Sequence, residues 1–180
     1  MSHEIALRTR RLELVAATLD HVLAELRAPA DLAALLLADV PASWPPGEYD
    51  GDALEYFRTK LAEGPDAVGW YGWYAISLTS DGSRQSVVAG AGYLGPPTPD
   101  GIVEIGYSVV PEERGRGYAT EAVQALVDRA LNTPTVRLLI AHTDVSNIAS
   151  STVLRRCGFK LVGSGQEPGS ARYELSRSAT

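Results

Sequence analysis

Hydrophobic and polar positions alternate with two different periods along the chain, and each change of period marks an element. Residues 10–16 set Leu12, Leu14 and Ala16 between charged positions, a spacing of two that predicts a half-exposed strand. Thr18 is suited to cap a helix that follows. The apolar positions of that helix recur at helical spacing: Leu19, Val22, Leu23 and Leu26. Further helices are expected at 30–38 and 52–64, the second ended by Gly64.

The rest of the chain predicts strands first and then an alternation of helices and strands. Three strands are expected as an antiparallel meander, because turn residues separate them. A helix, a continuous apolar strand, a second helix and two short strands should follow. The predicted ranges are strands at 69–78, 86–95 and 102–110, a helix at 119–131, a strand at 135–143, a helix at 147–159, and strands at 159–165 and 171–176. This order predicts a mixed α/β sheet in one domain spanning 1–180.

Composition narrows the class of protein without naming a function. The chain has 180 residues, 45% of them hydrophobic and 21% charged, and a net charge of −6. An acidic chain argues against non-specific binding to nucleic acid or to anionic lipid. No apolar stretch is long enough to cross a membrane, and charges interrupt any signal-like segment at the start. The single cysteine, Cys157, cannot form an internal disulfide, so a cytoplasmic location is expected.

The stretch "RGRGYA", residues 114–119, joins a predicted strand to a predicted helix. The first N–H groups of a helix lack backbone partners and attract anions, so glycines at this point allow a phosphate close approach. Arg114 and Arg116 add positive charge. A dinucleotide-binding loop would have a third glycine where Thr120 stands and would belong to the first βαβ unit, so it fits less well. A tight turn or a solvated charge cluster is the alternative without a ligand.

Two spaced motifs resemble the GNAT N-acetyltransferase superfamily. "RGRGYA" matches its [QR]-x-x-G-x-[GA] motif, and "NIASSTVLRRCGF" resembles its N-x-x-[SA]…GF segment. The start of the chain is similar to the branch that includes ribosomal-protein N-terminal acetyltransferases. The resemblance implies about seven mostly antiparallel strands with helices on both faces, acetyl-CoA as co-substrate, and an acceptor that is an amine-bearing small molecule or a peptide N-terminus. It is also compatible with a homodimer.

The same resemblance implies the residues of the coenzyme site. The oxyanion of the reaction would be held by a backbone N–H of Val109 or Val110. Asn147 would reach the pantetheine arm, although an asparagine opening a helix can equally be only its cap. The implied set is Val109, Val110, Arg114, Gly115, Arg116, Gly117, Tyr118, Ala119, Thr120 and Asn147.

Acetyl transfer needs a neutral amine, so a general base is expected. Glu104 is the only acid of the strand 102–110, and it matches a glutamate position of the family. Strand alternation places Gly106 and Ser108 on its face, which would leave room for an acceptor; a water-facing carboxylate is the alternative. Ser150 could hydrogen-bond the sulfur of the leaving group. Leu154 stands where many relatives have a tyrosine acid, which keeps a non-catalytic acyl-CoA-binding protein open as the second hypothesis.

Other reactive or aromatic side chains are given no role by the sequence. Cys157 is expected to be a small core residue rather than a nucleophile. His3, His21 and His142 lack the spacing of metal ligands, so no metal site is predicted. Trp44 and the aromatic residues of 70–74 are candidates for an acceptor pocket, or for the core.

Overall fold

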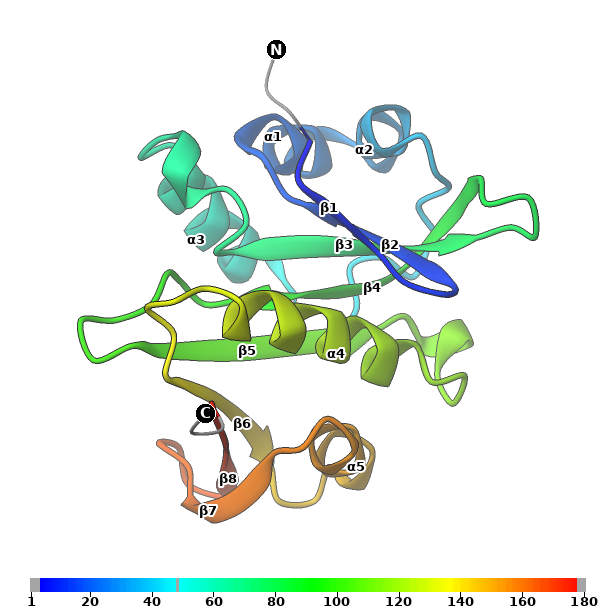
Figure 1. The fold of residues 1–180 in the computed structure, drawn as a ribbon. Helices are drawn as coiled ribbons and strands as arrows, with labels where there is room; N and C mark the ends of the chain where they lie inside the picture. Colours follow the sequence, from blue (N-terminus) through cyan, green and yellow to red (C-terminus); the bar gives the residue numbers. More distant parts are fainter. Residues whose placement is uncertain (1–3, 48, 178–180) are drawn as a thin grey trace.

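The computed structural model describes residues 4–47 and 49–177, and a single sheet runs through them (Figure 1). The sheet has eight strands in the order β1-β2-β3-β4-β5-β6-β8-β7. The strands are β1 (Ala6–Arg8), β2 (Leu12–Ala16), β3 (Gly72–Leu78), β4 (Arg84–Tyr93), β5 (Ile102–Val109), β6 (Leu138–Asp144), β7 (Lys160–Ser164) and β8 (Ser170–Ser176). The helices are α1 (Leu19–Arg27), α2 (Pro29–Leu36), α3 (Gly51–Leu61), α4 (Tyr118–Leu131) and α5 (Ile148–Arg156).

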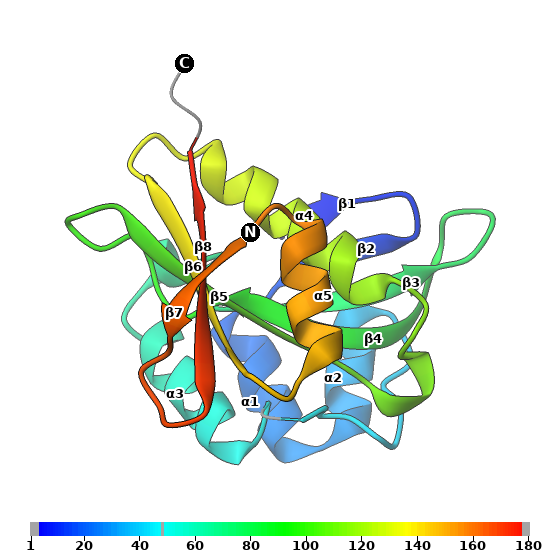
Figure 2. The same cartoon turned by 90° about the horizontal axis from the view of Figure 1, so that it is seen from below.

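Helices cover both faces of the sheet, as predicted (Figure 2). On one face α4 and α5 pack over the core, where Val123 and Leu126 lie with Leu14 and Trp73. On the other face lie α1, α2 and α3, and their core includes Val22, with Val15, Tyr74 and Ile76 from the strands. The mixed α/β class is therefore confirmed.

The helix boundaries follow from side chains that satisfy free backbone groups. Thr18 accepts from the His21 N–H while the His21 ring contacts the Thr18 N–H, so both residues cap α1. Asp50 caps α3 through the N–H groups of the first turn. Gly158, at φ +90°, directly follows the C-cap of α5. These boundaries lie within a few residues of the predicted ones.

The first part of the chain differs from the expectations in detail. The sheet has eight strands where about seven were expected, because the short strand β1 pairs antiparallel with β2 at its edge. β2 was expected to be half-exposed, but Val15 is as buried as Leu12 and Leu14, because helices cover both faces there. In α1, Leu23 and Leu26 are exposed.

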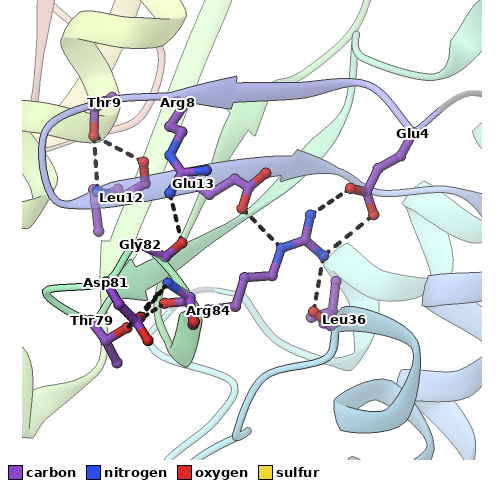
Figure 3. A network of polar contacts seen from close by, with 11 residues as sticks. Glu4, Arg8, Thr9, Leu12, Glu13, Leu36, Thr79, Asp81, Gly82 and Arg84 are labelled. Atoms are coloured by element: carbon purple, nitrogen blue, oxygen red, sulfur yellow. Dashed lines mark hydrogen bonds and ion pairs between the residues drawn. The ribbon is translucent and has the colours of Figure 1, made fainter.

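A charged network fastens the end of α2 to the edge of the sheet (Figure 3). Arg84 of β4 donates to the Glu13 carboxylate of β2 at 3.0 Å and to the Leu36 carbonyl of α2 at 3.0 Å. Its guanidinium holds the pKa of Glu13 below its usual value, mainly through this hydrogen bond. The network joins segments of β2, β4 and α2 that are far apart in sequence.

The two edges of β5 differ. Its β4 edge is paired antiparallel from Tyr93↔Ile105 to Ala89↔Val109. Its β6 edge is paired in parallel only from Ile102↔Leu138 to Glu104↔Ile140. Beyond Glu104 the two strands separate, and β6 continues with β8 instead. The separation opens the sheet beside the second half of β5.

Candidate active site

A groove of about 490 Å³ lies where β5 and β6 separate. It is bounded by the end of β5, the loop that follows and the inner side of α5. Its volume is within the range of small-molecule and cofactor sites. The residues lining it include Tyr107, Ser108, Val109, Arg114, Gly115, Gly117, Tyr118, Ala119, Thr120, Asn147 and Ser150. Nearly all of the coenzyme residues predicted from sequence are therefore brought together.

Backbone N–H groups of β5 point into this groove. In an antiparallel pair, successive residues direct their N–H groups to opposite edges. The Leu94 N–H donates to the Glu104 carbonyl, and the Val110 N–H donates to the Val88 carbonyl at 2.9 Å. The N–H groups of Tyr107 and Val109 therefore face the opened edge. Of the two alternative oxyanion donors, Val110 already donates its N–H to Val88 and is fully buried, which leaves Val109 as the candidate.

The loop before α4 is shaped by glycine. Gly115 and Gly117 have φ of +76° and +81°, which favour a residue without a side chain. Gly117 is the N-cap of α4, so no side chain caps the first N–H groups of this helix. The residues Pro111–Glu113 form a 3-10 turn that leads out of the strand. The loop thus presents a helix N-terminus to the groove.

The two loop arginines have protein partners. The Arg114 Nε donates to the Val109 carbonyl at 3.2 Å, which folds this side chain back along the groove. Arg116 forms an ion pair with Glu113 at 3.0 Å and is exposed. Arg116 does not line the groove, so only Arg114 of this pair is placed against it.

On α5, Asn147 and Ser150 face the groove together. The Asn147 Oδ1 accepts from the Ser150 N–H at 3.0 Å, so Asn147 is the N-cap of the helix. The Tyr107 hydroxyl lies 2.9 Å from both the carbonyl and the Oγ of Ser150. Burial raises the pKa of Tyr107 to about 12, so this hydroxyl keeps its proton at neutral pH. Sequence reasoning missed Tyr107, although strand alternation places it on the α5 side of β5.

Glu104 lies on the opposite face of β5, at the point where the strands separate. Its carboxylate is partly exposed, and Oε1 lies 2.8 Å from the Nδ1 of His142 on β6. The space predicted beside Glu104 for the acceptor is smaller than expected at Ser108, because the loop at Gly47 lies close to that side chain. At Gly106 the nearest side chain is the exposed Leu94. The sequence placed Glu104 and His142 38 residues apart, and only the register of β5 with β6 brings them together.

Residues 11–160 match the family described as the acetyltransferase (GNAT) domain. The chain belongs to the GNAT acetyltransferase family. The uncharacterized N-acetyltransferase YjdG of Bacillus subtilis is 30% identical over 159 residues, which cover 87% of this chain and 90% of that protein. The family assignment confirms the predicted acetyltransferase activity with acetyl-CoA as co-substrate, and favours an enzyme over a non-catalytic binding protein.

Solved GNAT structures share the fold. The ribosomal-protein-S5-alanine acetyltransferase of Vibrio fischeri superposes with a TM-score of 0.65 at 16% identity, covering 97% of both chains. RimL, a ribosomal L7/L12 α-N-protein acetyltransferase in complex with coenzyme A, gives 0.65 at 20% identity and covers 96% of this chain and 98% of its own. Several structures that share this fold are ribosomal-protein acetyltransferases.

Two positions considered for catalysis, Leu154 and Cys157, are core residues in this GNAT chain. Leu154 is fully buried in the core beneath α4 and α5, so it cannot reach the groove. Cys157 is buried as well, and burial raises its thiol pKa to about 11. A thiol with this pKa is protonated at neutral pH and is a poor nucleophile. The expectation that Cys157 is a core residue is confirmed.

The aromatic residues considered for an acceptor pocket are mostly core. Trp73 and Tyr74 are fully buried, and Trp44 is nearly so. The Trp44 Nε1 and the Tyr74 hydroxyl both donate to the Glu25 carboxylate at 2.6 Å. These contacts hold the loop carrying Trp44 against the sheet.

A second hollow, of about 830 Å³, lies between the β1–β2 turn and the outer side of α4. It shares Gly117, Thr120 and Arg156 with the groove, but Tyr107, Asn147 and Ser150 line only the groove. Within residues 4–47 and 49–177, no group of three or more His, Cys, Asp or Glu side chains could hold a metal ion. His3 lies outside the described residues. In the same part of the chain, no helix is long and apolar enough to cross a membrane.

Proposed function

We propose that the groove between β5 and β6 binds acetyl-CoA and that the acetyl group passes directly to a primary amine in a ternary complex. One observation carries the proposal: the groove is lined both by the unpaired edge of β5 and by the N-terminus of α4, which has glycine at its N-cap and no capping side chain. The N–H groups from Gly115 to Thr120 would hold the pyrophosphate. Arg114 would add positive charge beside it, and the exposed Arg116 would act only at longer range.

The pantetheine arm would follow the opened edge of β5. Its amide groups resemble a peptide, so the free N–H groups of Tyr107 and Val109 offer it backbone hydrogen bonds. Asn147 uses its Oδ1 to cap α5, which leaves its Nδ2 group for a carbonyl of the arm. The thioester would then lie near the end of β5, with its carbonyl oxygen toward the Val109 N–H.

The transfer needs four events at these residues. Glu104 takes a proton from the ammonium form of the acceptor, because only the neutral amine has a lone pair for attack. The nitrogen bonds to the thioester carbon, and the oxyanion is stabilised by the Val109 N–H. The carbon–sulfur bond breaks as the carbonyl re-forms, and the electron pair goes to sulfur. The acylated nitrogen gives up its second proton to the thiolate or to water, which leaves a neutral amide. The Ser150 hydroxyl can donate a hydrogen bond to that thiolate. Leu154 cannot, because its side chain has no donor.

The acceptor would enter from the Glu104 face, opposite α4 and α5. A carboxylate at the bottom of the gap favours a cationic amine, which matches either a peptide N-terminus or a small-molecule amine. Ribosomal-protein acetyltransferases among the similar structures make a protein N-terminus the first acceptor to test.

Free thiol released from acetyl-CoA tests this function. We expect release to be stimulated by at least one amine in a panel of ribosomal-protein N-terminal peptides, polyamines and aminoglycosides. The matched control for each peptide is the same peptide with its N-terminus already acetylated, which should give no stimulation. Equal thiol release with and without every free amine would contradict the proposal.

A further inference from the structure

His142 lies beside the predicted base rather than in the coenzyme groove. It belongs to β6, two residues beyond Ile140, which forms the last pair with Glu104 of β5. The side chains of residues two apart on a strand share a face, so His142 and Glu104 meet across the gap. Their Nδ1–Oε1 distance is 2.8 Å, and the side chains are 16% and 27% exposed. The contact therefore bridges β5 and β6 at the point where their pairing ends.

The surroundings of His142 direct it to Glu104 alone. On β8, Arg172 is its cross-strand partner, but the Arg172 Nε donates to Glu174 at 2.8 Å. In the part of the chain that the structure describes, the His142 Nε2 is buried and has no hydrogen-bond partner. A Cβ at Gly165 would lie 3.0 Å from the Cδ2 of His142, so the β7–β8 turn packs closely against the ring.

The chemistry of the pair fixes which nitrogen carries the proton when Glu104 is ionised. An ionised carboxylate only accepts hydrogen bonds, so the Nδ1 of His142 must be the donor. That bond occupies Oε1 and leaves Oε2 free. Without it, the carboxylate of a strand glutamate could rotate among several rotamers at the edge of the gap.

We propose that His142 is a positioning residue that orients the Glu104 carboxylate toward the acceptor amine. This inference rests on the proposed function and adds a residue that the established family match does not assign. His142 does not touch the reacting atoms. It donates Nδ1–H to Oε1, so that Oε2 takes the ammonium proton with the carboxylate already aimed. General-base catalysis is favoured when a second group orients the base. Here Glu104 would be the base, and His142, with its Nδ1 2.8 Å from Oε1, would orient it.

Substitutions at His142 separate this role from a merely structural one. His142→Ala removes the donor, and we expect kcat to fall by about 10- to 100-fold, the scale of a small misplacement of a catalytic group. The KM for acetyl-CoA should stay unchanged, because the groove lies on the other face. His142→Asn keeps an N–H near the place of Nδ1 and should recover most of kcat. CoA affinity, measured by calorimetric titration, shows that each variant is folded.

A double-mutant cycle with Glu104→Gln completes the test. We expect His142→Ala to cause no further loss of kcat in the Glu104→Gln background, because there is no base left to orient. Additive losses, or an Asn variant no better than the Ala variant, would overturn the role of His142 while leaving the proposed function intact. A fully active Glu104→Gln variant would overturn both the base and its positioning. Absence of amine-stimulated thiol release by the unmodified enzyme would instead sink the proposed function.

Discussion

The two edges of β5 show how one strand serves both as scaffold and as site. At its β4 edge, Ile105 to Val109 are paired residue by residue. At its β6 edge, pairing stops at Glu104, and the N–H groups of Tyr107 and Val109 have no strand beside them. A backbone N–H group without a partner is costly to bury, so a paired edge gives stability and an unpaired edge needs a ligand or water. The proposed site therefore lies where the β5–β6 pairing ends and backbone N–H groups of β5 are left without a strand partner.

The strand that closes this edge, β4, can be perturbed at a residue that does not line the groove. Gly92 has φ +151°, and a Cβ there would lie 2.2 Å from the Tyr71 carbonyl oxygen, so Gly92→Ala forces backbone to move. We expect the free energy of unfolding to fall by about 3 kcal/mol or more, measured by chemical denaturation. Gly106, directly opposite on β5, is the matched control.

At Gly106 an added Cβ would meet only the Leu94 Cδ1, at 3.7 Å. Gly106→Ala should therefore change stability by less than about 1 kcal/mol. Equal destabilisation by the two substitutions would show that the stability of β4 does not depend on the close approach of Gly92 to Tyr71.

The chemistry at the open edge is tested by Glu104→Gln, which keeps the shape of the side chain and removes its basicity. We expect kcat to fall about 10²-fold, the usual contribution of a general base, while CoA affinity is retained. Steady-state rates with the best acceptor and calorimetric titration with CoA measure the two quantities. An unchanged kcat and pH–rate profile would show that water or another group accepts the proton.

The smaller effects concern Asn147, which has a structural and a proposed ligand role. Asn147→Ala should lose about 1 kcal/mol of stability with the helix cap and should also raise the KM for acetyl-CoA several-fold. Asn147→Asp keeps the capping oxygen and removes the amide donor. It should preserve thermal stability and still raise this KM. A normal KM in both variants would make Asn147 a cap only.

Sequence periodicity predicted the elements well where a helix or strand is long and covered on one face. It missed β1, because three residues are too few to show an alternation. It also predicted β2 as half-exposed, because charged neighbours such as Glu13 looked solvent-facing, whereas Arg84 pairs with Glu13 in the folded chain. In each case the deciding partner is distant in sequence.

At the site too, local sequence predicted the residues of each motif but not the contacts between residues distant in sequence. Residues of the glycine loop and the start of α5 were predicted together because each motif is local. His142 and Tyr107 were not, because their roles depend on register: His142 meets Glu104 across β5 and β6, and Tyr107 meets Ser150 across a strand and a helix. Arg116 looked like a phosphate ligand by its place in the loop, but its guanidinium pairs with Glu113.

The central claim is that the coenzyme occupies the opened edge of β5 and the start of α4. Calorimetric titration of CoA into Ala119→Trp tests it most directly, because Ala119 lines the groove within the first turn of α4. Gln124→Trp, on the outer side of the same helix, is the matched control. We predict that Ala119→Trp weakens CoA binding at least 10-fold, because the indole fills the space for the phosphates, while Gln124→Trp binds normally. Undiminished affinity in a folded Ala119→Trp variant would contradict the account.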